Sequence, residues 1–216
     1  MADNYLERRF EEVFGSGAGH SGKHPKRKDY PSLDTLLHKN RSHRSFDSSN
    51  APSPEVLAKI VEVNTLIPSA GNQQSLRFRI LSSPEETQKV LSDIKMGAAL
   101  PELHLPVQGT EPPSYIIVMG TKEESRFVDI DLGISLQSMA LRSVDLGYNA
   151  LIVCNFNPDK LKEDLSLPYK PLAVLAVGKG KDSIFLMPCS EGESLKYYRK
   201  EGVHYVPKIK LEDLLV

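Results

Sequence analysis

The sequence contains no tryptophan and only two cysteines, Cys154 and Cys189. The cysteines form no CxxC pair, and they form no metal-ligand cluster with the six scattered histidines. Neither a disulfide framework nor a structural zinc site is therefore expected. The GxGxxG and GxxxxGK(S/T) signatures are also missing, which excludes the familiar dinucleotide-binding and P-loop frameworks.

Long apolar segments are absent as well. The first residues, MADNYLERRFEEVF, are charged and lack the apolar core of a signal peptide, and no later segment approaches a membrane-spanning length. The net charge of −1 creates no overall field that would attract nucleic acid or a membrane surface. With 216 residues, 40% hydrophobic and 25% charged, the chain is expected to be a cytoplasmic globular protein with one sizeable core.

Residues 1–32 are expected to form a loosely ordered arm. The stretch NYLERRFEEVF is typical of a short helix, and the Gly-, Ser- and Lys-rich stretch after it is typical of a loop. The basic run KHPKRK within this arm fits either a nucleic-acid patch or a solvated surface, and the solvated surface is favoured.

A regular pattern of helices and strands begins at Leu33. Helices are expected over 32–40, 53–67, 83–94, 127–147 and 157–165, with a short one at the C-terminus. Strands are expected over 76–81, 114–120, 149–156 and 171–180. This mixture predicts an α+β fold in which a mixed sheet lies between helical layers, over a domain spanning 33–216.

The expected helix over 127–147 is apolar around much of its circumference. Its apolar side chains fall on several sides, namely Ile130, Ile134, Leu141 and Val144 on one side and Leu132, Leu136 and Met139 on others. A helix of this kind lies inside a structure or across a dimer interface.

The stretch NRSHRSF, residues 40–46, contains an Arg-Ser-x-Arg motif. Arginine offers a planar fork of donors that fits a phosphate, and serine adds a hydroxyl. By itself the motif fits a solvated loop better than a phosphate cradle, and His43 is expected to be exposed in that loop.

A second motif, Pro68–Gln74, follows the expected helix over 53–67. Its small residues would let the backbone approach a flat ligand, and Asn72 and Gln74 could read a polar ring edge. An ordinary turn rich in Ser, Gly and Asn explains this stretch equally well.

Together, the two motifs resemble the nitroreductase family of flavoproteins. The pattern Arg-Ser-x-Arg-x-Phe is matched by Arg41, Ser42, Arg44 and Phe46, and the pattern Pro-Ser-Ala-x-Asn-x-Gln is matched over 68–74. The long helix, the stretch VCNF and the C-terminal VPKIK also follow in the family's order.

The resemblance implies a three-layer α/β/α sandwich with a mixed, mostly antiparallel sheet, in an intertwined homodimer that binds FMN at its interface. Arg41, Ser42 and Arg44 would hold the phosphate and ribityl chain, and Lys208 and Lys210 would approach the same phosphate. The 68–74 motif would line the flavin from the partner subunit, with the backbone of Cys154 and Asn155 near its reactive nitrogen. The implied cofactor-binding residues are Asn40, Arg41, Ser42, Arg44, Pro68, Ser69, Ala70, Asn72, Gln74, Cys154, Asn155, Lys208 and Lys210.

The sequence departs from the family pattern at positions that bear on substrate choice. Ser75-Leu76 stands where many members have Pro-Trp, and Cys154-Asn155 stands where some have Glu-Gly. Cys154 was weighed as a redox-active thiol and as a small buried side chain, and the latter is favoured. Gln137 is expected to hydrogen-bond within the interface rather than to touch the flavin.

The expected activity is hydride transfer from NAD(P)H through FMN to a nitroaromatic, quinone or similar acceptor, in a ping-pong cycle. Because the cofactor carries the chemistry, no catalytic acid or base needs to stand out. The loop over 96–113, with Glu102, His104 and Gln108, is the candidate substrate lid. A flavin-binding protein without turnover, and an α+β protein that binds no flavin, remain as alternatives.

Overall fold

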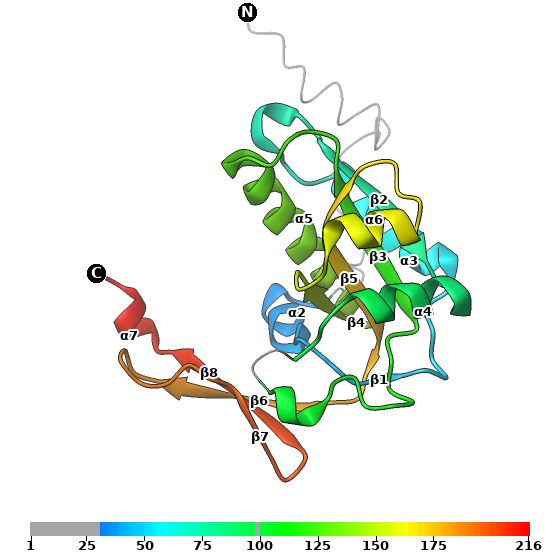
Figure 1. Cartoon of the computed structure of the whole chain (residues 1–216). Helices are drawn as coiled ribbons and strands as arrows, with labels where there is room; N and C mark the ends of the chain where they lie inside the picture. The colour runs from blue at the N-terminus through cyan, green and yellow to red at the C-terminus, as the bar shows by residue number, and fades with distance from the viewer. Residues whose placement is uncertain (1–30, 98–99) are drawn as a thin grey trace, which may run out of the picture. The chain divides into compact units, whose positions relative to one another are not determined.

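The structure, a computed structural model, describes residues 31–97 and 100–216 (Figure 1). The expected N-terminal helix and the basic run over 23–28 lie outside the described residues. Residues 32–216 form one compact unit.

The helices follow the expected positions closely. They are α2 (Leu33–Lys39), α3 (Pro54–Glu62), α4 (Pro84–Asp93), α5 (Arg126–Asp145), α6 (Pro158–Asp164) and α7 (Leu211–Leu214). Short 3-10 turns are η1 (Val63–Thr65), η2 (Ala70–Asn72) and η3 (Pro101–Leu103).

Side-chain caps explain where the helices begin. Ser53 accepts a hydrogen bond from the amide of Val56 and is followed by a proline, as the sequence predicts for α3. The hydroxyl of Ser83 caps α4 and also donates to the Glu86 carboxylate at 2.8 Å.

The central sheet is built around one long strand. Its strands are β1 (Phe46–Asp47), β2 (Leu76–Leu81), β3 (Ser114–Gly120), β4 (Asn149–Val153) and β5 (Lys170–Gly180). β5 pairs with β1, β3 and β4, while β2 pairs with β3, and every one of these pairs is antiparallel. β3 is buried throughout, which matches its continuous apolar sequence.

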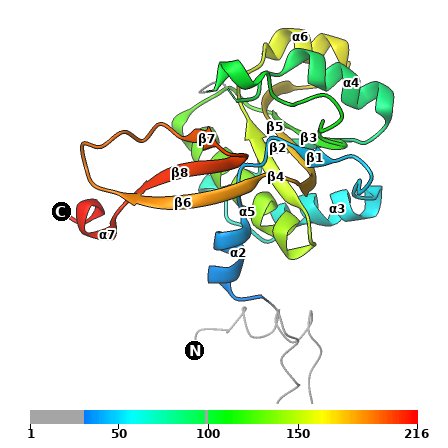
Figure 2. The ribbon, with the colours of Figure 1, turned by 90° about the horizontal axis from the view of Figure 1, so that it is seen from below.

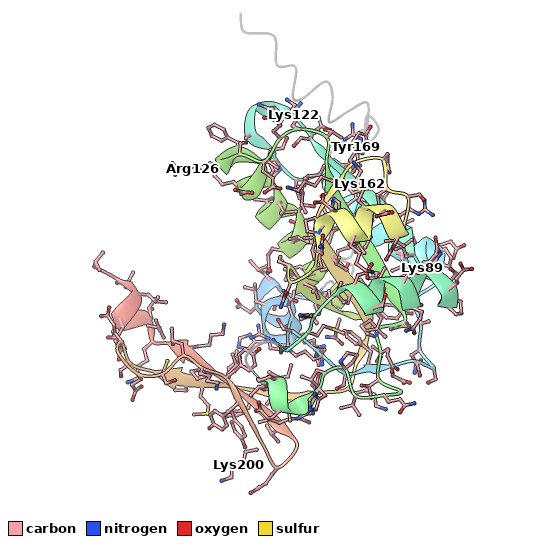
Figure 3. The ribbon with its side chains drawn as sticks, in the orientation of Figure 1. Lys89, Lys122, Arg126, Lys162, Tyr169 and Lys200 are labelled. Carbon is pink, nitrogen blue, oxygen red and sulfur yellow. The ribbon has the colours of Figure 1, made fainter. Side chains whose placement is uncertain are left out.

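Helices cover both faces of this sheet, as the sequence predicts for a layered α+β fold (Figure 1). Side chains alternate between the faces of a strand, so neighbouring residues of β3 enter different cores. Ile117 packs in the core that also contains Val90 of α4 and Leu161 of α6. Ile116 packs in the other core with Leu57 of α3 and Met139 of α5. The outer surfaces of α4 and α6 carry exposed lysines, including Lys89 and Lys162 (Figure 3).

The C-terminal region contains three strands that the sequence reading did not predict. They are β6 (Ser183–Cys189), β7 (Tyr198–Lys200) and β8 (Val203–Ile209). β6 and β8 lie side by side and are parallel, while β7 is antiparallel to β8 (Figure 2). The parallel pair implied by a mixed sheet is therefore found in this second sheet, which we call the C-terminal sheet, and not in the central one.

One further expectation needs correction. The expected strand over 149–156 ends at Val153, because the chain then turns and the carbonyl of Asn155 accepts from the amide of Lys95 at 2.8 Å. Helix α5, expected to be apolar around much of its circumference, buries the apolar residues Val128, Leu136, Met139 and Ala140 together with Asp131, Ser135 and Ser143. Phe127 and Ile130 on the same helix are 61% and 46% exposed.

Among the described residues, no helix is both long enough and apolar enough to cross a membrane.

Candidate functional site

The Arg-Ser-x-Arg motif forms the turn between α2 and β1. Its position is set by a close approach to Gly180, at the end of β5, which pairs with Phe46. A Cβ atom at Gly180 would lie 2.3 Å from the His43 ring, so only glycine leaves room for that ring. His43 is buried, with 8% of its surface exposed, and the expectation of an exposed loop histidine is wrong. Packing against β5 therefore orients the residues on either side of it.

Asp182, just before β6, holds the same turn from the other side. Its Oδ2 accepts hydrogen bonds from the backbone amides of Arg44 and Ser45, at 2.6 and 2.9 Å. Its Oδ1 accepts from the Arg199 guanidinium at 3.3 Å, and its side chain is only 5% exposed. These bonds fix the turn against the C-terminal sheet, and a buried carboxylate satisfied in this way is well stabilised.

The Arg44 guanidinium lies 4.7 Å from the centre of the Tyr197 ring. It also donates to the Tyr197 hydroxyl at 3.3 Å and to the Ser42 carbonyl at 3.1 Å. Arg41 donates to the Leu37 carbonyl, its buried Nε has no partner among the described residues, and burial lowers its pKa. Neither guanidinium lies within 4.0 Å of a described carboxylate. Positive charge is therefore available here for an anionic ligand.

These arginines line a cavity of about 360 Å³, which we call the Arg44 pocket. Its polar lining consists of Asn40, Arg41, Ser42, Arg44, Gln137, Tyr197, His204 and Lys208. Its apolar lining consists of Leu37, Ala140, Ala150, Ile152, Ile184, Leu186 and Val206. The combination of cationic and apolar side chains around one cavity suits a ligand that carries both a phosphate and an apolar part.

Gln137 meets Asn40 in this pocket, where the Asn40 amide donates to the Gln137 Oε1 at 3.5 Å. Lys208 lines the pocket, but Lys210 does not, because it donates to the Ser190 hydroxyl at 3.2 Å instead. Of the two predicted lysines, Lys208 therefore lines the same pocket as Arg41 and Arg44.

His204 is 3% exposed, and its Nε2 has no partner among the described residues. Burial lowers its pKa, the nearby Arg44 and Arg199 charges act in the same direction, and Asp182 opposes them. The ring is therefore neutral at neutral pH, and it lies 5.1 Å from the Tyr197 ring.

The second motif forms a tightly held loop. Gly71, Asn72 and Gln74 have left-handed φ values of 54°, 52° and 46°. The buried Asp131 accepts from the Ala70 amide at 2.8 Å, and the Ser69 hydroxyl accepts from the Gln74 amide at 3.1 Å. Left-handed backbone at non-glycine residues is costly and tends to gather at binding sites. These bonds hold the loop in a shape that the backbone alone would not favour.

This loop lines a different cavity, of about 470 Å³, which we call the Ser69 pocket. Pro68, Ser69 and Gln74 contribute to its wall. The remaining lining is mostly from α3, β2 and α5: Ala58, Val61, Glu62, Asn64, Thr65, Ile67, Ser75, Leu76, Arg77, Phe78, Ile80, Asp131 and Ser135. A single chain thus places the two motifs in separate cavities.

Cys154 lines a third cavity, of about 260 Å³, together with Phe156. It is exposed and free, so the expectation of a small buried side chain is wrong. Partial desolvation still raises the pKa of its thiol, which disfavours the reactive thiolate. Asn155 is exposed beside it.

Sequence reasoning missed Asp182, Tyr197 and His204. Asp182 and Tyr197 are 138 and 153 residues from Arg44 along the chain, and no local pattern links them to it. The sequence does contain one indication of His204. Side chains alternate along a strand, so a strand through this region places His204 on the same face as Val206 and Lys208.

Comparison with known proteins identifies the family of this fold. A model of the nitroreductase family matches residues 37–179 of the chain. No match was found among curated proteins.

Solved structures give a similar result. A nitroreductase family protein from Clostridium novyi NT is 23% identical with a TM-score of 0.60, over 70% of this chain and 87% of that one. A protein from Exiguobacterium sibiricum 255-15, named a putative nitroreductase in complex with FMN, is 19% identical with a TM-score of 0.58, over 70% and 90%. A variant of a nitroreductase from Sphigopyxis sp. strain HMH, named FMN- and NADPH-dependent, is 17% identical with a TM-score of 0.57, over 70% and 89%. At these identities the likeness shows the fold.

Proposed function

This chain belongs to the nitroreductase family of oxidoreductases, and we propose that it binds FMN and passes hydride from NAD(P)H to a nitroaromatic, quinone or similar acceptor. The observation that carries the proposal is the Arg44 pocket. It presents Arg41, Arg44 and Lys208, none of which is within 4.0 Å of a described carboxylate, beside an apolar wall. The structures of the Exiguobacterium and Sphigopyxis relatives, named for FMN, support the same choice of cofactor.

The residues of the pocket fit the phosphate end of FMN. A phosphate carries close to two negative charges and offers several acceptor oxygens. Arg41 and Arg44 would donate to it as planar forks, Ser42 would add a hydroxyl, and Lys208 would add an ammonium group. Asn40 would supply an amide at the same end. Lys210 would join only by leaving the hydroxyl of Ser190.

The ring end of FMN would require a second copy of the chain. Pro68, Ser69, Ala70, Asn72 and Gln74 lie in a loop that is already shaped, but in one chain it borders the Ser69 pocket. A homodimer in which each partner's loop meets the other's Arg44 pocket would complete two sites. The exposed apolar residues Phe127 and Ile130 of α5 support α5 as part of that interface.

When bound, FMN would supply the hydride chemistry, and the chain would supply position, charge and shelter from water. The backbone of Cys154 and Asn155 would lie near the ring. The loop over 96–113, where Glu102, His104 and Gln108 are exposed, would close over the acceptor. The raised pKa of the Cys154 thiol favours transfer through the flavin over a thiol-based route.

The first experiment is a visible spectrum of the purified full chain, before and after the addition of FMN. Oxidised flavin gives bands near about 370 and 450 nm, and anaerobic NADPH or NADH should bleach them. Recovery of the bands on addition of a quinone or nitroaromatic would establish turnover. Bands that no reduced nicotinamide bleaches would indicate a flavin-binding protein without this activity, and a protein that FMN cannot reconstitute would overturn the proposal.

A further inference from the structure

The C-terminal sheet lies outside the part of the chain that the family model matches, which ends at residue 179. One face of this sheet nevertheless lines the Arg44 pocket, through Ile184, Leu186, His204, Val206 and Lys208, and Tyr197 joins them from the segment before β7. This wall is therefore a feature of this chain beyond the matched family region.

The other face of the C-terminal sheet carries a separate aromatic cluster. Tyr198 stacks on Tyr205, with 5.2 Å between the ring centres, and Phe185 meets Tyr205 edge-on at 6.0 Å. The neighbours Tyr197 and Tyr198 thus belong to opposite faces, because successive side chains of an extended chain alternate. This pair provides a matched comparison within one short segment.

Tyr197 restrains the Arg44 guanidinium and still leaves some of its N–H groups free to bind a ligand. A guanidinium over an aromatic ring is attracted to the face of the ring by its positive charge, and this attraction does not require all of its N–H groups. Here the ring centre is 4.7 Å from the guanidinium carbon. Of the five N–H groups that an arginine carries, one is used by the Tyr197 hydroxyl and one by the Ser42 carbonyl, which leaves others for a ligand.

The surroundings of Tyr197 reinforce this restraint. The buried His204 ring lies against the Tyr197 ring at 5.1 Å. Asp182, which directly precedes β6, accepts a hydrogen bond from the backbone amide of Arg44 at 2.6 Å. Two residues that directly precede strands of the C-terminal sheet, Asp182 and Tyr197, therefore hold Arg44 at its backbone and at its guanidinium.

We propose that Tyr197 is a positioning residue that holds the Arg44 guanidinium for the phosphate of FMN, so that the C-terminal sheet makes the pocket select phosphorylated over unphosphorylated flavin. The proposal rests on the proposed function, because it assumes that FMN is the ligand. It extends that function by assigning phosphate selectivity to a wall that the matched family region does not contain.

The test is a double-mutant cycle on the full chain stripped of flavin, with FMN and riboflavin affinities measured by quenching of flavin fluorescence. Tyr197→Ala should weaken FMN binding about tenfold, between the sizes expected for an exposed and for a desolvated cation–π contact, and change riboflavin binding less than about twofold. Tyr197→Phe keeps the ring and should lose only about two- to threefold. Tyr198→Ala, on the other face, should leave both affinities unchanged.

The cycle separates positioning from general damage to the fold. If Tyr197 acts through Arg44, adding Tyr197→Ala to Arg44→Ala should weaken FMN binding no further. Additive losses, or equal losses for FMN and riboflavin, would overturn the proposal. If the unchanged chain binds FMN and Tyr197→Ala does not weaken that binding, this inference alone is overturned. No FMN binding by the unchanged chain would overturn the proposed function and this inference with it.

Discussion

The Arg44 pocket and the Ser69 pocket differ in how the chain builds them. The Arg44 pocket is cationic and gathers residues from α2, α5, β4 and the C-terminal sheet. The Ser69 pocket is mainly apolar and is lined by α3, β2 and the loop that joins them, with two residues from α5. One is made by bringing distant segments together, and the other mostly by the shape of one short stretch. Under the proposed function, the Arg44 pocket would bind the phosphate of FMN, and the 68–74 loop of a second copy of the chain would line the ring.

The difference extends to what holds each pocket in place. The Arg44 turn depends on close packing, since the His43 ring fills the space that Gly180 leaves open. The 68–74 loop depends on backbone conformation, since three of its residues are left-handed and Asp131 anchors its start. Substitutions should therefore damage the two regions for different physical reasons.

The largest effect is expected from removing the charge that distinguishes the Arg44 pocket. Arg44→Ala should weaken FMN binding by about 100-fold, because about 2.7 kcal/mol of charge-assisted hydrogen bonding to the phosphate is lost. Isothermal titration of the flavin-free protein would measure this change. Arg79→Ala is the control, since Arg79 is exposed and pairs with Glu86 on the surface. An unchanged FMN affinity in Arg44→Ala would remove Arg44 from the phosphate site.

A second prediction tests the packing of the Arg44 turn. Gly180→Ala should lower the free energy of unfolding by about 2 kcal/mol, because the added methyl group would overlap the buried His43 ring. Urea unfolding would measure the loss. Adding His43→Ala should recover part of it, since the ring that clashes is then gone. If the double variant is no more stable than Gly180→Ala, contact with His43 is not the cause.

A third prediction tests the backbone of the 68–74 loop. Gly71→Ala should lower the free energy of unfolding by about 1 kcal/mol, because Gly71 has a left-handed backbone with φ 54°. The space around it is sufficient, since the nearest atoms would lie 3.8 Å from the added Cβ. Gly71→Asn should cost less, since asparagine tolerates left-handed backbone better. Equal losses for alanine and asparagine, measured by urea unfolding, would point to crowding instead of conformation.

The smallest effect expected is a pH dependence of the free energy of unfolding, caused by two buried histidines near Arg44, His43 and His204. Burial is the main cause that lowers the pKa of His43 and the pKa of His204. The negative charge of Asp182 opposes this lowering at both histidines. The positive charge of Arg44 adds to it at both, as does that of Arg41 at His43 and that of Arg199 at His204. Because the unfolded chain then binds more protons, stability should be complete above about pH 6.5 and should fall as the pH drops toward the folded pKa values.

Urea unfolding at several pH values between 5 and 8 would measure this slope. His204→Phe should reduce it, because one of the two groups with a lowered pKa is removed. A slope that does not change in this variant would assign the pH dependence to other groups.

Much of the fold was predictable because its determinants are local. Ser53 followed by a proline marks the start of α3, and the Ser83–Glu86 pair marks the start of α4. The apolar run of β3 indicates a strand buried on both faces, and the structure buries all of it. The C-terminal sheet escaped prediction because β6 and β8 each contain a proline, β7 has only three residues, and aromatic side chains such as Phe185 are exposed.

The candidate site, like the fold, has features that the sequence predicts and features that it does not. By itself the sequence determined the two motifs, the family they belong to and the chemistry of their side chains, because residue types and short spacings define the motifs and the hydrogen-bond donors that they contain. Only the tertiary structure decided that His43 is buried, that Lys208 joins the arginines while Lys210 does not, and that Asp182 and Tyr197 hold Arg44. Those outcomes depend on contacts between segments far apart in the chain, which are set by packing and charge in three dimensions and leave no local mark in the sequence.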